Sequence, residues 1–376
     1  MGYKYLNLNN EGNHKLHYDP EALRPYQEEL RSFLSWDQSL DNLEFAKKML
    51  FSHELKANNQ IEGYTDNIDI INEIIHEKTK DIKNTERRER ILNLYKGYQY
   101  ILENKNINTK SLKELYEILS HNLLDSYDLT HMGELYREAP VYILKNGRLE
   151  HELDEGMDYH HIAKHINEYF NFLNSPNLET DSLDIYIKSQ ILHFYFVYVH
   201  PYFDVNGRTS RTISLWYLLN KKSYPYIIFN RGLSFAGGKY DREIRLAKQN
   251  FNLTEFLKFL LITLKIELEK EHIIEDIIKT SKFTLTDNNY QTLLYFITMH
   301  SNKTILDFAK FYNNFNDKKR SKTIYEEMLL PLIDLDILKV TRFTKKSLDN
   351  LPNMDLSLNT ENFDYNPNYL KRVKLK

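Results

Sequence analysis

The stretch that decides the fold is HPYFDVNGRTSR, residues 200–211. Immediately before it, Ile185–Val199 is apolar almost all round, which predicts a buried central helix that ends at His200. After it, Thr209–Asn220 has helical spacing, so a second helix begins near Arg208. The pattern therefore predicts two helices joined by a short polar loop.

The residue types in this loop indicate phosphate chemistry. His200 is held at the end of a rigid helix, and Asp204 supplies a hard oxygen ligand suited to Mg²⁺. Asn206-Gly207 predicts a tight turn whose N–H groups, together with the next helix N-terminus, bind anions. Arg208 and Arg211 lie three residues apart and suit bidentate phosphate contacts. We expect a base beside a polyphosphate site, and transfer of a phosphate-containing group.

The segment resembles the signature of the Fic (filamentation induced by cAMP) family, His-Pro-Phe-x-(Asp/Glu)-Gly-Asn-Gly-Arg-x-x-Arg. Seven positions match: His200, Pro201, Asp204, Asn206, Gly207, Arg208 and Arg211. Tyr202 replaces Phe, and Val205 replaces Gly. Because a β-branched residue resists positive φ, we expect Val205 at φ < 0 and Gly207 to keep the unusual dihedral angle.

The resemblance implies a protein adenylyltransferase that moves AMP from ATP to a Ser, Thr or Tyr hydroxyl of a protein, the chain itself included. It makes His200 the base that deprotonates the hydroxyl and Asp204 the ligand of Mg²⁺. Asn206 would contact the α-phosphate with the Gly207 and Arg208 amides, and Val205 lies in the same nest. Arg208 would also stabilise the leaving pyrophosphate.

The same resemblance assigns the γ-phosphate to Arg211. Ser234 and Tyr240 lie where relatives place residues of the nucleobase pocket. A hairpin is predicted over Met132–Leu153, where an Asn-Gly pair follows Val141, Tyr142 and Ile143. By similarity this is the family's flap, which aligns a target segment by strand addition, and Gly133, Tyr136 and Arg137 resemble its lead-in.

An upstream segment, Asn58–Gly63, resembles the family's inhibitory helix, which implies the class in which that helix precedes the core. Glu62 would pair with Arg211 and so occupy the γ-phosphate contact. Asn58 stands where Ser or Thr is usual, and a Glu-Gly pair is also an ordinary helix C-terminus. Two alternatives within the family stay open: removal of AMP, with Glu62 positioning a water, and transfer of another nucleotide or of phosphate.

The C-terminal block, residues 281–376, has a different character. Helical patterns over Asp287–Met299, Ile305–Tyr312 and Lys318–Leu338 precede a strand pattern over Lys339–Thr344, the order of a winged helix-turn-helix. The block carries 15 Lys+Arg and 11 Asp+Glu. This modest positive charge leaves open whether the block pairs two copies of the chain, docks another protein or binds DNA, as a regulator would.

Composition sets the remaining expectations. The chain has 376 residues, enough for two or three domains, and only 11 Gly and 9 Pro, which favours a mainly α fold. It has no Cys, so disulfides and thiolate chemistry are excluded. With no signal-peptide pattern or membrane-length apolar run, we expect a cytoplasmic protein without membrane contact. We expect three parts: a helical region with the inhibitory segment (1–110), a Fic-type core with its hairpin flap (111–280) and a winged-helix-like domain (281–376).

Overall fold

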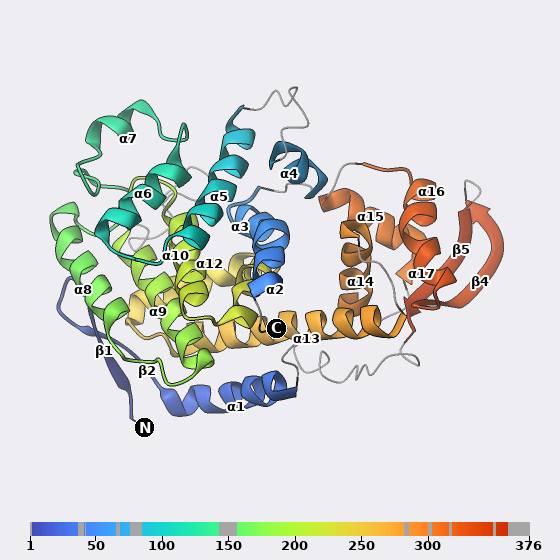
Figure 1. The fold of residues 1–376 in the computed structure, drawn as a ribbon, viewed down its shortest axis with the longest axis horizontal. Coiled ribbons are helices and arrows are strands. Elements are labelled where there is room, and N and C mark those ends of the chain that lie inside the picture. The colour runs from blue at the N-terminus through green and yellow to red at the C-terminus, as the bar shows by residue number, and fades with distance from the viewer. Residues whose placement is uncertain are drawn as a thin grey trace. The chain divides into compact units, whose positions relative to one another are not determined.

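The computed structural model describes residues 2–36, 41, 43–64, 68–75, 85–142, 156–281, 286–299, 303–315, 318–348 and 351–359. It divides into two compact units (Figure 1). The first comprises Met1–Tyr64 and Ile70–Lys265, and the second comprises Thr65–Asp69 and Ile266–Lys376. The division into three parts with borders at 110 and 280 stays a prediction.

The first unit opens with a β-hairpin. Strand β1 (Lys4–Asn9) pairs antiparallel with β2 (Lys15–Tyr18), with Lys4 opposite Tyr18. Leu6 and Leu8 alternate with exposed residues along β1 and are buried, because side chains two apart point to the same face of a strand. A helical region was expected over residues 1–110, and this hairpin was not predicted.

Helices make up most of the first unit, which confirms the prediction of a mainly α fold. They are α1 (Pro20–Trp36), α2 (Leu43–Met49), the π-helical turn η1 (Leu50–Glu54), α3 (Leu55–Ile61), α4 (Ile68–Ile75), α5 (Thr85–Glu103), α6 (Thr109–Ser120), α7 (Ser126–His131), the 3₁₀ turn η3 (Tyr159–His161), α8 (Ile162–Asn174), α9 (Ser182–Val199), α10 (Asn206–Asn220), the 3₁₀ turn η4 (Tyr224–Ile228), α11 (Phe229–Ser234), α12 (Gly238–Asn250) and α13 (Thr254–Ser281). Ile68 and Asp69 of α4 belong to the second unit, and so does the part of α13 from Ile266 to Ser281.

The two helices around the motif form the centre of this unit. Helix α9 is buried along nearly its whole length, as its apolar sequence predicts, and α10 packs against it. Helix α10 begins at Asn206, earlier than the expected start near Arg208. Helix α13 continues to Ser281, because Ile273 and Ile277 prolong its buried stripe.

The second unit contains helices and a following strand in the predicted chain order, with a short unpredicted strand after the first helix, and the winged-helix assignment stays a prediction. Helix α14 (Asp287–Met299), the short strand β3 (Lys303–Thr304) and α15 (Ile305–Phe315) come first. They are followed by α16 (Ser321–Ile324), the π-helical turn η5 (Tyr325–Leu329) and α17 (Leu330–Asp334), and then by β4 (Leu338–Leu348) and β5 (Leu351–Leu358). The sheet order is β3-β5-β4, with antiparallel neighbours.

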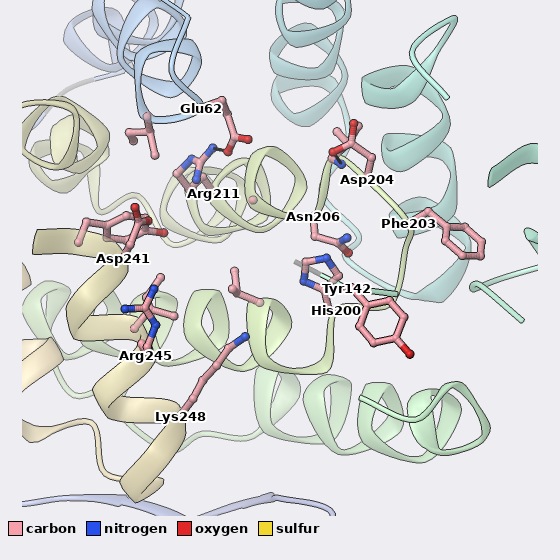
Figure 2. Close-up of a pocket in the computed structure, with 16 residues that line it drawn as sticks. Glu62, Tyr142, His200, Phe203, Asp204, Asn206, Arg211, Asp241, Arg245 and Lys248 are labelled. Carbon is pink, nitrogen blue, oxygen red and sulfur yellow. Dashed lines mark hydrogen bonds and ion pairs between the residues drawn. The ribbon is translucent and has the colours of Figure 1, made fainter. Parts of the chain in front are cut away.

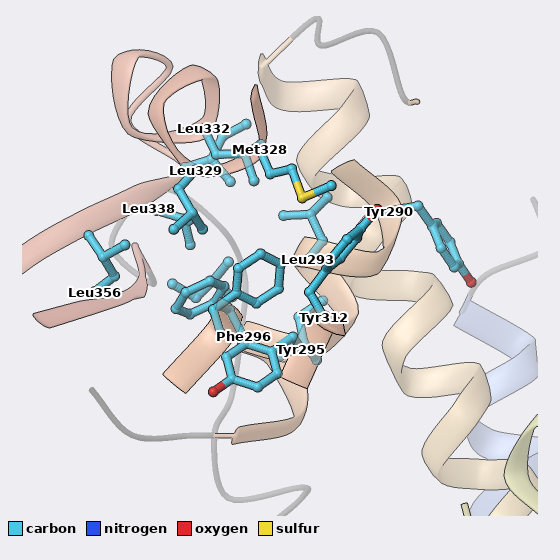
Figure 3. Close-up of a cluster of buried hydrophobic side chains, with 14 of the residues drawn as sticks. Tyr290, Leu293, Tyr295, Phe296, Tyr312, Met328, Leu329, Leu332, Leu338 and Leu356 are labelled. Atoms are coloured by element: carbon cyan, nitrogen blue, oxygen red, sulfur yellow. The ribbon is translucent and has the colours of Figure 1, made fainter. Parts of the chain in front are cut away.

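This unit has a hydrophobic core of its own (Figure 3). Leu293 and Phe296 from α14 meet Leu332 from α17 and Leu356 from β5 in one buried cluster. The predicted helix over Lys318–Leu338 is shorter in the structure, which places a π-turn in its middle and a strand at its end. Strand β5 was not predicted from the sequence.

Within the described residues, no helix combines the length and the apolar character needed to cross a bilayer.

Candidate active site

Helix α9 delivers His200 to the site. Asp181 caps the helix N-terminus by accepting a hydrogen bond from the Asp184 N–H at 2.8 Å. At the other end, the His200 N–H donates to the Phe196 carbonyl at 2.9 Å, and His200 takes left-handed backbone angles with φ 52°. The helix therefore stops at His200, and the imidazole lines the cavity beyond it.

Arg137 fixes the backbone around His200. Its Nε donates to the His200 carbonyl at 2.9 Å, and its Nη1 donates to the Ala139 carbonyl at 2.7 Å. Its Nη2 donates to the Met157 carbonyl. Burial lowers the pKa of Arg137 to about 10, which leaves it charged at neutral pH. One buried guanidinium thus ties Ala139, inside the predicted flap, and Met157, beyond its predicted end at Leu153, to the histidine backbone.

The predicted flap residues are only partly within the described structure. The Gly156 N–H donates to the Val141 carbonyl at 2.9 Å, so the chain before residue 142 meets the chain after residue 155. Tyr142 is exposed and lines the cavity. Ile143 lies outside the described residues. A hairpin between these ends stays a prediction.

The loop after His200 is held by its own side chains. Tyr202 is buried and stacks on Tyr116 from α6, with ring centroids 3.5 Å apart. The Asn206 amide accepts from the Tyr202 N–H at 3.0 Å and donates to the Tyr202 carbonyl at 2.8 Å. Asn206 therefore closes the loop, and a second Nδ2 hydrogen is left for a ligand.

The expected dihedral angles of Val205 and Gly207 are wrong. Val205 has φ 65° and ψ 8° at the N-cap of α10, whereas Gly207 lies inside that helix with no positive φ. A left-handed β-branched residue costs about 1–2 kcal/mol. Val205 is only 2% exposed, and burying such a side chain contributes about 1.5–3 kcal/mol, which offsets the strain.

Gly207 is needed for space instead. A Cβ at Gly207 would lie 2.6 Å from Oε1 of Glu62 and 3.1 Å from Nη1 of Arg211. An anionic group therefore already fits against the first turn of α10, where unpaired N–H groups and the helix dipole favour negative charge. The carboxylate of Glu62 occupies this position.

Glu62 forms an ion pair with Arg211 (Figure 2). Arg211 is 2% exposed, and its Nε donates to Oδ1 of Asn58 at 2.7 Å, so the unusual residue of the upstream segment also holds the guanidinium. Burial alone would raise the pKa of Glu62, but the charges of Arg211 and Arg208 and the bond from Arg211 keep it below its ordinary value. The pair therefore persists at neutral pH.

The end of helix α3 sets the position of Glu62. Glu62 is the C-cap, and Gly63 follows with φ 86°. The Gly63 N–H donates to the Gln60 carbonyl at 3.0 Å and the Tyr64 N–H donates to the Asn59 carbonyl at 3.1 Å, which is a Schellman motif. The alternative interpretation of Glu-Gly as a helix C-terminus is correct, and the same geometry directs Glu62 at Arg211.

Arg208 and Asp204 lie beside the anion-binding first turn of α10, which we call the anion cradle. Nη2 of Arg208 is 3.8 Å from Oδ2 of Asp204, whose side chain is 58% exposed. Arg208 is buried, yet its Nε and Nη1 have no hydrogen-bond partner within the described part of the chain. Since a buried guanidinium without partners is costly, these donors fit an anionic ligand.

A cavity of about 460 Å³ is lined by residues that include His200, Asp204 and Arg211, whereas Arg208 is not among its lining residues. Asp241, Arg245 and Lys248 from α12 line the wall across from His200 and Asn206 (Figure 2). Sequence reasoning missed these α12 residues, although spacings of three and four on a helix place them on one face with Ile244. This periodicity is the signal that could have found them.

Of the two residues predicted for the nucleobase pocket, one lines the cavity and the other does not. Tyr240 lines the cavity and is buried. Ser234 ends α11, where its hydroxyl donates to the Arg231 carbonyl at 2.8 Å, and it is not among the residues that line the cavity. The structure therefore brings Tyr240 to the site and leaves Ser234 outside it.

The environment of His200 keeps its imidazole neutral. Burial, followed by the positive charges of Lys248 and Arg137, lowers its pKa to about 3. A neutral imidazole can accept a proton, and a pKa this low makes it a weaker base than an ordinary histidine. The site thus combines a base, a buried anion cradle and an exposed carboxylate.

A model of the Fic/DOC family matches residues 106–218, which include the loop, the cradle and Arg211. The chain contains a Fic domain. Proteins with Fic domains typically transfer nucleotide or phosphate groups to proteins, so the chain is placed among transferases in general.

Solved Fic structures share the fold. A Fic family protein from Desulfovibrio desulfuricans G20 has a TM-score of 0.54 and 17% identity, over 90% of this chain and 95% of that one. A fragment of Fic-1 from C. elegans has a TM-score of 0.50 and 16% identity, over 67% of this chain and 71% of that one. No curated protein matches the chain.

Proposed function

We propose that the Fic domain transfers AMP from ATP to a Ser, Thr or Tyr hydroxyl of a protein, and that Glu62 restrains this activity. The observation that carries the proposal is the Glu62 carboxylate seated between Gly207 and Arg211. A site that accepts one anion at a helix N-terminus is suited to accept a phosphate there when that anion leaves.

The reaction needs only groups that line or border the cavity. Neutral His200 accepts the proton of the target hydroxyl, whose oxygen forms a bond to the α-phosphorus. The bond between the α-phosphorus and the bridging oxygen breaks, and pyrophosphate leaves with the electron pair. The donors of Arg208 and Arg211 face the charge that develops on the phosphates, which stabilises the transition state. The resemblance to the Fic family implies that relatives which transfer phosphate lack the second half of the motif. The presence of both Arg208 and Arg211 therefore favours AMP transfer over phosphate transfer.

Mg²⁺ fits this arrangement through Asp204. One carboxylate oxygen accepts from the Val205 N–H at 2.6 Å, and the exposed group borders the cavity. Within the described residues no three His, Cys, Asp or Glu side chains are grouped around a metal position. An ion there would take one carboxylate, phosphate oxygens of ATP and water, a set that Mg²⁺ favours, and would supply charge neutralisation of the phosphates.

The decisive experiment incubates the chain with ATP and Mg²⁺, labelled at the α- or the γ-phosphate. We expect the α-label alone to enter protein, and Glu62→Gly to raise incorporation at least about tenfold, because the anion that competes for Arg211 is gone. Glu62→Gln, which keeps the size but loses the charge, should lie between. His200→Ala should abolish transfer.

Each result decides between the alternatives. Equal incorporation by wild type and Glu62→Gly would remove the inhibitory role. Incorporation of the γ-label would indicate phosphate transfer. Release of AMP from a labelled target by the wild-type chain, lost in Glu62→Gly, would identify the protein as one that removes AMP.

A DNA-binding regulator is the less favoured function. Lys319 and Lys322 on or beside α16 lie 2.8 Å and 3.7 Å from Glu327 and Glu326, so this helix carries mixed charge. A DNA-binding face needs several unopposed cations. Salt-dependent DNA binding by His200→Ala, in a chain that transfers no AMP, would reverse this preference.

A further inference from the structure

The chain that follows Glu62 rests on helix α5 through one aromatic side chain. The guanidinium of Arg90 lies over the ring of Tyr64, with its Cζ 3.3 Å from the ring centroid. Arg90 comes from the second turn of α5 and is 5% exposed, whereas Tyr64 is 36% exposed. Both residues belong to the first unit. The ring therefore covers a buried cation.

The backbone couples Tyr64 to Glu62. The N–H groups of Glu62 and Tyr64 each donate to the Asn59 carbonyl at 3.1 Å, and the Gly63 N–H donates to the Gln60 carbonyl at 3.0 Å. These three hydrogen bonds make the end of α3 one rigid turn, because a Schellman motif fixes the residues on both sides of its left-handed position. A contact that holds the Tyr64 ring in place thus also holds the Glu62 carboxylate in place.

Helix α3 has another contact with α5, and that one belongs to the site. The Asn58 amide donates to the Tyr98 hydroxyl at 3.1 Å, and the Asn58 side-chain oxygen accepts from Arg211. Tyr64 and Arg90 differ, because neither is among the residues that line the cavity. A change at either residue therefore acts on the position of α3 without removing a group that would bind a phosphate.

We propose that the Tyr64 ring and the Arg90 guanidinium form a latch that keeps the end of α3 on α5 and so keeps Glu62 paired with Arg211. This inference rests on the proposed function, because it takes Glu62 as the group that restrains transfer. The physical basis is the attraction between a cation and the negative face of an aromatic ring, which is stronger when little water reaches the cation. With the latch open, Glu62 leaves Arg211 more often.

The latch acts on activity through a population. In the seated state Glu62 occupies the contact of the γ-phosphate, and in the released state that contact is open to ATP. A contact made only in the seated state raises the share of that state by its own equilibrium factor. Loss of the latch therefore raises activity by up to that factor, as long as the released state is the minor one.

A role in packing alone makes a different prediction. Nη1 of Arg90 also lies 3.7 Å from Oε1 of Glu86, one turn earlier on α5. If Arg90 served only to join the turns of α5, its loss would lower stability without raising transfer, and replacing the Tyr64 ring would have no effect. A latch instead gives the same increase from either side of the contact.

The first measurement is incorporation of α-labelled AMP by the full chain with ATP and Mg²⁺. Arg90→Met keeps the stem but removes the charge, Tyr64→Leu keeps apolar bulk but removes the ring, and each should raise incorporation about fivefold. Tyr64→Phe retains the ring face and should stay within about twofold of the wild type. The double variant should exceed neither single one, because both remove the same contact. Lys96→Met, which removes an exposed charge from the same helix, is the control and should change nothing.

The increase has to pass through Glu62. In Glu62→Gly the restraining group is gone, so adding Arg90→Met or Tyr64→Leu should give no further incorporation. An equal increase in that background, or a Tyr64→Phe variant as active as Tyr64→Leu, would overturn the latch.

A second readout needs no nucleotide. Hydrogen exchange at the amides of Glu62, Gly63 and Tyr64 measures opening of the end of α3. Arg90→Met leaves the intrinsic exchange rates of these amides unchanged, because it lies elsewhere in the sequence, and it should speed their exchange about fivefold. Unchanged exchange would overturn the latch. If no variant incorporates label, the proposed function fails, and the exchange rates still decide whether Arg90 holds the end of α3.

Discussion

At the scale of single residues, Val205 and Gly207 differ from their expected backbone conformations. The motif suggested that a glycine supplies the left-handed angle, but Val205 does so and Gly207 supplies space. The residue types at the site could be identified from the sequence because each carries a distinct chemistry. Their dihedral angles could not, because buried contacts of the Val205 side chain decide whether strain is tolerated.

The left-handed angle of Val205 has a measurable signature. Val205→Gly and Val205→Ala lose similar packing, but only Gly takes positive φ without strain, so the Gly variant should be more stable than the Ala variant by about 1 kcal/mol. Thermal unfolding of both variants measures the difference. Val199, inside α9 and fully buried, is the matched control, where Ala should be the more stable of the two. The same order at both positions would contradict the assigned angle.

The pH profile of His200 follows from its lowered pKa. The base form exists above the pKa, so lowering that value extends activity toward acid. In Glu62→Gly, kcat/KM should show no acid limb near pH 6.5, the ordinary range of a histidine. Lys248→Met removes one of the charges that lower the pKa and should move the limb upward. An acid limb at or above pH 6.5 in Glu62→Gly would show that the imidazole is not perturbed.

At the scale of elements, helices with a long regular pattern could be predicted almost to the residue. Helix α14 has the predicted bounds Asp287–Met299, because its apolar spacing is local information. The start of α10 was missed because Asn206 joins the helix through contacts with Tyr202 that no helical pattern encodes. The wall formed by α12 was missed because its polar residues acquire a role only when the fold places them opposite His200.

The turn η1 that precedes α3 contains a buried acid with its own pH dependence. Burial raises the pKa of Glu54 to about 8, against the opposing charge of Arg231. A group whose pKa rises on folding stabilises the fold fully below its unfolded pKa, near about 4.3, and this contribution is lost as pH approaches 8. Stability should therefore fall between pH 5 and pH 8.

The variant Glu54→Gln should remove this dependence. We expect its melting temperature at pH 8 to exceed that of the wild type by at least about 2 °C and to vary less with pH. Glu103→Gln, at an exposed side chain of α5, is the control and should change neither value. A parallel pH dependence of Glu54→Gln and wild type would show that Glu54 ionises normally.

At the scale of the whole molecule, two units carry separate cores. Phe308 is fully buried in the cluster of the second unit, and Phe196 is fully buried in the first. Replacing a buried Phe by Ala costs about 3–5 kcal/mol. Phe308→Ala should lower one of two calorimetric transitions and Phe196→Ala the other. A single transition that both variants shift equally would mean that the units unfold as one.

The hydrogen bonds of Arg137 have a consequence for how such a protein can change its targets. Its guanidinium contacts the carbonyls of His200, Ala139 and Met157, and every amino acid offers a carbonyl. The contact therefore places no demand on which side chains lie between Val141 and Gly156. If this segment aligns a target protein, as the resemblance to the family implies, substitutions there alter which proteins are recognised while His200 keeps its place, so recognition and chemistry can evolve separately.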